Sequence, residues 1–266
     1  MITQPTLVRH WSRANARDGA LDAVRWLAML AMTVDHLCFV MSPRLDGIYV
    51  LMRVLVPFTF FWIAGLHALK LAPGTAARAL PWRSLGLMAL FGLIAQLPYR
   101  LAFGTGTDPL NILFTLLLAQ VLLWGVVRRD LLMVLGPACV AFTLEVTGLR
   151  LCYGMVAIVL PALVYLGLKA GGWKGRAWQV LTALTLAYCH MPAKQTEALL
   201  TGRGWVWFTP QTAYAFAMMA LVSVWLVPHL YRQLQRWDLH LWHGPRWFFH
   251  GYYAGHLVLI AAVAAA

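Results

Sequence analysis

Charged residues are scarce in this sequence, and acidic residues are the scarcest of them. Only 11% of the 266 residues are Asp, Glu, Lys or Arg, and Asp and Glu together number nine. Soluble domains carry about a quarter charged residues, so a soluble globular protein is excluded. Hydrophobic residues make up 61% of the chain, and the mean hydropathy is +0.70. The composition therefore predicts an integral membrane protein.

Cysteine is also rare, and its spacing argues against metal or redox chemistry. The four cysteines, at positions 38, 139, 152 and 189, form no CxxC or CxxH pair. Zinc sites and redox dithiols usually use such closely spaced ligands. We therefore expect these cysteines to be small buried residues, and we expect no metal site.

Long apolar runs follow one another from residue 21 onward, each long enough to cross a bilayer as a helix of about twenty residues. They predict helices near residues 21–41, 48–69, 84–103, 110–127, 131–148, 153–168, 177–192, 210–230 and 247–264. We see no cleavage site before the first span, so we expect it to be retained rather than removed as a signal peptide. The predicted fold is an all-α, polytopic membrane bundle of about nine transmembrane helices. We expect a basic segment at residues 1–20 and a single domain at residues 21–266.

The positive charge is distributed unevenly between the predicted loops. The formal net charge is +12, and alternate loops carry fourteen and five Lys and Arg residues if the basic N-terminal segment is counted with the first set. Such a bias is the positive-inside pattern of membrane proteins. It predicts a cytoplasmic N-terminus and explains the charge without a nucleic-acid partner.

Ionisable residues interrupt some of these apolar spans. Asp35 and His36 lie side by side in the first span, Arg53 lies in the second, and His256 falls near the middle of the last. Such groups are costly in lipid unless they are paired or hydrated, so we expect them inside the bundle with a functional role. By depth, Arg53 should lie near His36, with Asp35 as its nearest anion. A purely structural salt bridge between the first two helices is the alternative.

Further polar residues fall in the same layer, toward the outer ends of their predicted helices. Asn111 is either a helix-start residue or a site residue, and Tyr153 is either interfacial or functional. Thr115, Glu145 and His190 are weaker candidates for contact with a substrate.

Arg25 and His36 are eleven residues apart on one predicted helix. This spacing places them on nearly the same face, rotated by about 20° and separated by roughly 16.5 Å. An extended phosphopantetheine arm spans a similar length. Arg25 could therefore bind coenzyme A phosphates, helped by Arg78 and Arg83, while a thioester reaches His36.

Several segments resemble, in order, the motifs of the TraX family. They are RWLAMLAMTVDHLCFVM, MRVLVPFTFFWIAGL, LNILFTLLL, LCYGMVAIVL and YYAGHLVLI, which together run from about residue 21 to residue 260. The resemblance implies a multi-pass protein of the bacterial inner membrane that transfers acetyl from acetyl-CoA to the N-terminus of a conjugative pilin. The family's motif positions fall on Asp35, His36, Arg53, Asn111, Thr115, Tyr153, Gly154 and His256. The chain is also similar, more distantly, to the transmembrane acyltransferase superfamily, in which an arginine, ten residues and a histidine mark the first helix.

These residues suggest a mechanism of direct acyl transfer. His36, oriented by Asp35, would act as general base, and Arg53 or Asn111 would face the developing oxyanion. Adjacent residues on a helix diverge by about 100°, so Asp35 could instead serve Arg53 and leave another group to orient His36. Three alternatives remain: an acyltransferase for a glycan or lipid hydroxyl, a proton-coupled transporter, and a non-catalytic assembly factor for a pilus.

Overall fold

A computed structural model describes residues 18–41, 46–71, 81–103, 109–190, 210–237 and 247–265, without the side chains of residues 38–41, 46–51, 71 and 210–217. Within these ranges the chain forms α-helices and one 3-10 helix, and extended backbone pairs as an isolated parallel bridge between Leu110 and Leu151. The all-α prediction is therefore confirmed for the described residues. Most of the predicted basic segment at residues 1–20 lies outside them.

The helices follow the predicted apolar runs closely. They are α2 (Gly19–Met41), α3 (Asp46–Leu71), α4 (Trp82–Phe103), α5 (Ile112–Arg128), α6 (Leu131–Val146), the 3-10 helix η3 (Met155–Val159), α7 (Leu160–Ala170), α8 (Gly172–Cys189), α10 (Pro210–Leu234) and α11 (Phe248–Ala265).

The largest departures from the predicted bounds lie around α7 and α8. The run predicted at residues 153–168 begins as η3 and becomes α-helical only from Leu160, where Pro161 occupies the first turn of α7. The run predicted to begin at residue 177 begins at Gly172. Gly171 and Gly172 both have positive φ, of 60° and 52°, which is the backbone conformation that separates the two helices.

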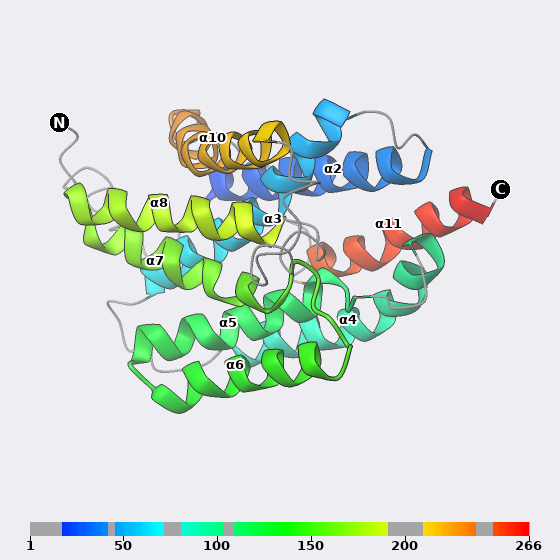
Figure 1. Cartoon of the computed structure of the whole chain (residues 1–266), viewed down its shortest axis with the longest axis horizontal. Helices are drawn as coiled ribbons and strands as arrows, with labels where there is room; N and C mark the ends of the chain where they lie inside the picture. Colours follow the sequence, from blue (N-terminus) through cyan, green and yellow to red (C-terminus); the bar gives the residue numbers. More distant parts are fainter. Residues whose placement is uncertain are drawn as a thin grey trace.

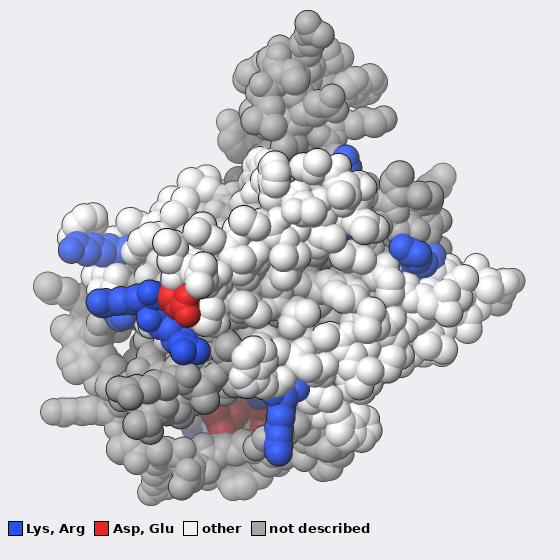
Figure 2. Space-filling view, turned by 90° about the horizontal axis from the view of Figure 1, so that it is seen from below, with Lys and Arg blue, Asp and Glu red and all other residues white. Residues whose placement is uncertain are grey.

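Three described helical segments are long and apolar enough to cross a membrane: Met52–Lys70, Trp82–Phe103 and Phe248–Ala265. The apolar helices Ile112–Arg128, Leu131–Val146 and Met155–Ala170 are shorter. In Figure 2 the charged side chains lie toward the margins of the view, and the central part of this face is free of them, as a lipid-facing surface requires. A helical membrane protein is consistent with these features, and the nine-span topology stays a prediction.

The helices pack side by side as hairpins and longer-range pairs (Figure 1). α5 and α6 form one hairpin and α7 and α8 another, while α11 lies along α4 and also contacts α2. Within the first hairpin, a Cβ on Gly125 would lie 2.7 Å from the backbone carbon of Met133. Only glycine permits such an approach, and small residues at close contacts are typical of helix packing in membranes.

Two clusters of buried apolar side chains fill the interior of the described part. The larger one joins α2, α3, α5, α7, α8 and α10. The smaller one includes Met32, Val56, Tyr99, Tyr253 and Leu257, and so brings together α2, α3, α4 and α11. The candidate site lies beside this smaller cluster.

A polar contact fastens one end of the bundle. Asp18, just before α2, accepts hydrogen bonds from Lys70 at the end of α3 and from Tyr231 on α10. Partial burial alone would raise the pKa of Asp18, but the hydrogen bonds from Lys70 and Tyr231 outweigh burial and hold this pKa below its ordinary value. Asp18 therefore ties three helices together as a carboxylate.

Candidate active site

Asp35 and Arg53 form an ion pair between α2 and α3. Arg53 Nη1 donates a hydrogen bond of 3.1 Å to Asp35 Oδ2, and Asp35 is only 3% exposed. The predicted pairing of these two residues is present in the structure. A buried carboxylate and a partly buried guanidinium each supply the counter-charge that the other needs.

His36 and His256 lie against each other in the interior, although they belong to the first and last described helices. His36 Nδ1 is 2.8 Å from His256 Nε2, and the two rings are nearly parallel, with centroids 5.1 Å apart. Their exposed fractions are 8% and 6%. The two histidines that the sequence singled out are therefore in direct contact.

The hydrogen-bond partners of the ring nitrogens determine which nitrogen of each ring carries the proton. His256 Nδ1 lies 3.1 Å from the carbonyl oxygen of Tyr252, which can only accept, so Nδ1 carries a proton. In a neutral ring the other nitrogen, Nε2, is then an acceptor. The bond between the rings therefore requires His36 Nδ1 to donate, which leaves His36 Nε2 unprotonated.

Asp35 does not orient His36 by a hydrogen bond. The distance from His36 Nε2 to Asp35 Oδ2 is 3.9 Å, beyond hydrogen-bonding distance, and both atoms are acceptors in the assigned tautomer. The predicted orientation of His36 by Asp35 is therefore wrong for the neutral ring, and His256 takes that position. If Nε2 gained a proton, the nearby carboxylate would stabilise the resulting imidazolium.

Tyr252 holds His256 in place by a second contact. Its ring stacks on that of His256, with centroids 5.5 Å apart and an interplanar angle of 15°. Its hydroxyl is 2.7 Å from Thr33 Oγ1, and Thr33 Oγ1 donates to the carbonyl of Met29. Thr33 and Tyr252 were not predicted from the sequence. The spacing of four residues between Tyr252 and His256, which places both on one helix face, was the available signal.

Tyr153 and His190 lie beside Arg53, as their predicted depth suggested. The Arg53 guanidinium carbon is 5.9 Å from the centre of the Tyr153 ring, whose centroid is 5.1 Å from that of His190. Both nitrogens of His190 face backbone carbonyls, Nδ1 that of Leu186 and Nε2 that of Arg53, each at 2.7 Å. His190 therefore fixes the end of α8 against α3, which leaves its nitrogens unsuited to binding a substrate.

The backbone at Tyr153 and Gly154 is unusual. Tyr153 has φ of 69°, a left-handed conformation that costs free energy in a residue other than glycine, and Gly154 follows with φ of 72° and ψ of 173°. Thr115 anchors this turn by donating a 2.9 Å hydrogen bond to the carbonyl of Cys152. Thr115 thus acts on the turn, and its hydroxyl is directed at backbone.

Asn111 is fully buried and makes structural hydrogen bonds. Its side-chain oxygen caps α5 by accepting from Leu113 N at 3.0 Å, and its amide nitrogen donates to the carbonyl of Gly92 and to Gln96 Oε1. These contacts fit the helix-start alternative raised by the sequence. An oxyanion would have to compete with both acceptors for the amide of Asn111.

The remaining predicted site residues have other partners. Glu145 lies near Arg150, with Oε1 and Nε 3.7 Å apart. Arg25 donates a 2.6 Å hydrogen bond to Asp22, and its guanidinium lies over the Phe249 ring. Arg83 is exposed at the start of α4, and Arg78 lies outside the described residues. Of these residues, the three that the structure describes, Glu145, Arg25 and Arg83, do not contact the histidine pair.

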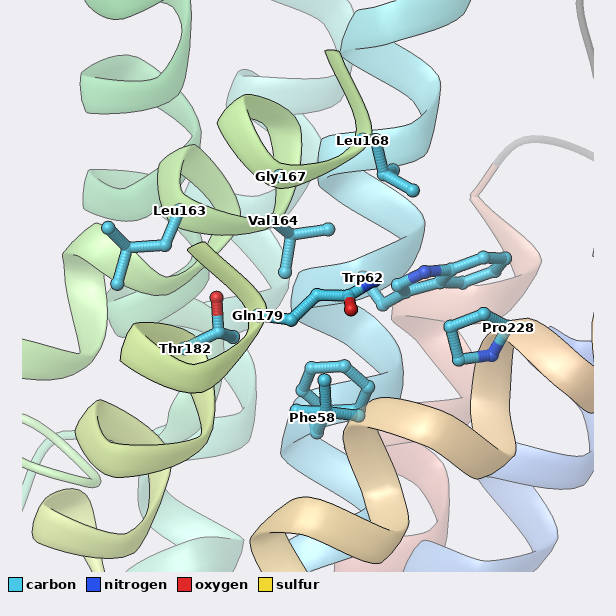
Figure 3. A pocket seen from close by; sticks show the side chains of 10 residues that line it. Phe58, Trp62, Leu163, Val164, Gly167, Leu168, Gln179, Thr182 and Pro228 are labelled. Atoms are coloured by element: carbon cyan, nitrogen blue, oxygen red, sulfur yellow. The ribbon is translucent and has the colours of Figure 1, made fainter. Parts of the chain in front are cut away.

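An apolar pocket lies in another part of the bundle, between α3, α7, α8 and α10 (Figure 3). Phe58, Trp62 and Val164 are among its apolar lining residues, and Gln179 and Thr182 also line it. None of the predicted site residues lines this pocket. The chemistry suggested by the sequence therefore belongs to the histidine pair.

The comparisons with known proteins agree with the motifs that meet at this site. Searches of curated proteins and of solved structures gave no significant match. The family model described as TraX protein matches residues 20–264, a stretch that contains both histidines and runs from the second residue of α2 to the last but one of α11. This family implies a conjugation-related protein that acts in pilin processing. The match covers nearly the whole chain, and the chain therefore belongs to the TraX family.

Proposed function

We propose that this protein is an acetyltransferase of the bacterial inner membrane that moves an acetyl group from acetyl-CoA to the N-terminal amine of a conjugative pilin. The observation that carries the proposal is the chain of contacts from His36 Nδ1 to His256 and from His256 to the carbonyl of Tyr252, which assigns the lone pair of His36 to Nε2. A buried imidazole with a defined lone pair is suited to general-base catalysis.

In the proposed reaction the pilin amine attacks the thioester carbonyl carbon, and the carbon–sulfur bond breaks. His36 Nε2 takes a proton from the attacking nitrogen and then gives it to the departing sulfur, so the base is regenerated and coenzyme A leaves as the thiol. While His36 carries this proton, Asp35 Oδ2, 3.9 Å away, stabilises the imidazolium. Arg53 balances the charge of Asp35, so the pair stays neutral overall.

The donor would approach from the cytoplasmic end of α2. This helix is continuous from Gly19 to Met41, so Arg25 and His36 keep the spacing of roughly 16.5 Å expected for one helix. The Arg25 side chain is 28% exposed and is bonded to Asp22, so a phosphate would share Arg25 with this carboxylate. Arg83, exposed at the start of α4, is a second candidate for phosphate binding.

The direct test is the mass of a pilin co-expressed with the protein. We expect wild type to add the mass of one acetyl group at the pilin N-terminus, and we expect His36→Gln to slow this reaction by about 10²- to 10⁴-fold. The matched control is His229→Gln, because His229 is also a histidine within a helix but stacks on Trp225 of α10 instead.

The possible results separate the alternatives. Unmodified pilin in the presence of wild type would exclude the proposed acceptor, and an acetylated glycan or lipid in the same cells would identify another. Full acetylation by the folded His36→Gln variant would exclude His36 as the base. Transport of protons by proteoliposomes without acetyl-CoA would support the transporter instead.

A further inference from the structure

The centre of the site contains a carboxylate oxygen that no group in the described residues satisfies. Asp35 Oδ2 accepts from Arg53, but Asp35 Oδ1 is buried and has no hydrogen-bond partner there. A buried acceptor without a donor costs free energy, and such atoms are few in folded proteins. An unpaired oxygen at this position therefore points to a donor from outside the described part of the chain, and a bound substrate can supply one.

His36 Nε2 is a second acceptor beside it. The ring protons assigned above leave this nitrogen with a lone pair, and it lies 3.9 Å from the other oxygen of the same carboxylate. The His36 side chain retains 10% exposure, so the site is not completely closed. A single nitrogen that donates to two acceptors can join atoms up to about 6 Å apart.

We propose that Asp35 Oδ1 and His36 Nε2 form a two-acceptor site that selects a primary amine by the number of its N–H groups. A neutral primary amine donates one N–H to each acceptor and keeps its lone pair for attack on the thioester. A hydroxyl has one hydrogen, and a secondary amine has one N–H, so either leaves one buried acceptor unpaired. Asp35 is then the residue that determines acceptor specificity. This inference rests on the proposed acetyl transfer.

The charges around the site favour a neutral nucleophile. Arg53 of α3 neutralises Asp35, and His256 of α11 bonds to the far side of His36. The Tyr153 ring, in the turn before η3, lies with its centre 5.9 Å from the Arg53 guanidinium carbon and adds no charge of its own. The described surroundings provide no further carboxylate that contacts the pair, so an added ammonium would bring uncompensated charge. The α-amine of a peptide has a pKa of about 8, so a neutral fraction is available near neutral pH.

The test uses three pilin-derived peptides that differ only at the first residue. They begin with alanine, with N-methylalanine or with lactic acid, and so offer a primary amine, a secondary amine or a hydroxyl. With the full-length protein in detergent and acetyl-CoA, we expect kcat/KM for the alanine peptide to exceed that for each analogue by about tenfold to a hundredfold.

A variant shows whether Asp35 causes the preference. In Asp35→Leu/Arg53→Met, which removes both charges together and also removes the acceptor oxygens of Asp35, we expect the ratio of kcat/KM for the alanine peptide to that for the N-methylalanine peptide to fall toward one. The ratio is measured within a single variant, so a general loss of folded protein does not change it. His229→Gln serves as the control and should keep the wild-type ratio.

The possible results test three claims separately: the two-acceptor site, the role of Asp35 in specificity, and the proposed acetyl transfer. Equal use of the three peptides by wild type overturns the two-acceptor site while leaving the acetyl transfer intact. An unchanged ratio in the double variant removes Asp35 as the specificity residue. If wild type acetylates none of the peptides and no pilin in cells, the proposed function itself fails. If the double variant does not fold, the wild-type preference against the lactic acid and N-methylalanine peptides still decides whether the site discriminates.

Discussion

The imidazole of His36 donates from Nδ1 to Nε2 of His256, which lies 220 positions later in the chain. The carbonyl of Tyr252 fixes the direction of this bond, because it can only accept a proton from the other nitrogen of His256. His256 is therefore a positioning residue for the proposed base, a task that the sequence had suggested for Asp35.

Replacement of His256 tests this assignment. We expect His256→Leu to slow acetylation about a hundredfold, because His36 then loses the acceptor that sets its tautomer. His256→Gln can offer an amide oxygen to the same proton and should retain more activity. The measurement is the rate of acetyl transfer to a pilin peptide by protein of equal folded fraction. Equal losses in both variants would contradict the tautomer argument.

The ion pair of Asp35 and Arg53 should matter for stability as well as for chemistry. We expect Arg53→Met to lower the free energy of unfolding by about 3 kcal/mol, because it leaves a buried carboxylate unpaired. Asp35→Asn/Arg53→Met should be less destabilised than the sum of the two single variants. Thermal unfolding in detergent of the four proteins gives the coupling. Strict additivity would mean that the two side chains do not stabilise each other.

The contact of Asp18 with Lys70 and Tyr231 predicts how stability depends on pH. The folded-state pKa of Asp18 lies below its ordinary value of 3.8, so the unfolded chain binds the proton first as the pH falls. The stabilisation is complete above the unfolded-state pKa and is lost as the pH falls through the folded-state pKa. We therefore expect wild type to melt above Asp18→Asn near pH 7, with the difference shrinking below about pH 4. Parallel melting curves down to pH 3 would be inconsistent with this carboxylate contact.

The turn at Gly154 should be intolerant of a side chain. With φ of 72° and ψ of 173°, Gly154 lies in a region that other residues rarely adopt, so we expect Gly154→Ala to destabilise the protein by about 1–3 kcal/mol. It should also slow acetylation, because the turn places Tyr153 beside Arg53. Gly136→Ala, where a Cβ meets nothing within 4 Å, is the matched control and should be neutral or slightly stabilising. Equal melting temperatures for the two variants would contradict the strained turn.

The sequence predicted the helices well because apolar runs decide where helices form in this chain. It also identified Asp35, His36, Arg53 and His256, since ionisable groups in apolar spans are rare enough to stand out. Depth along each helix then predicted that Asp35 would meet Arg53. These features depend on composition and on distance along one helix.

Which residue contacts which nitrogen could not be predicted in the same way. Helix rotation decides whether His36 meets Asp35 or His256, and rotation follows from packing between segments far apart in the sequence. Asn111, Thr115 and His190 are polar residues at the expected depth, but they bond to backbone or cap helices, which only the three-dimensional contacts reveal. Tyr252 was missed because an aromatic residue in an apolar span does not stand out by itself, and only its spacing of four residues from His256 could have pointed to it.

The contact between α2 and α11 also constrains how the protein becomes active during synthesis. One imidazole enters the membrane with the earliest described helix, and the other emerges from the ribosome only after more than two hundred further residues. A nascent or prematurely terminated chain would have an unpaired histidine and no positioned base. In the proposed reaction, His36 would therefore become an oriented base only after α11 has packed against α2.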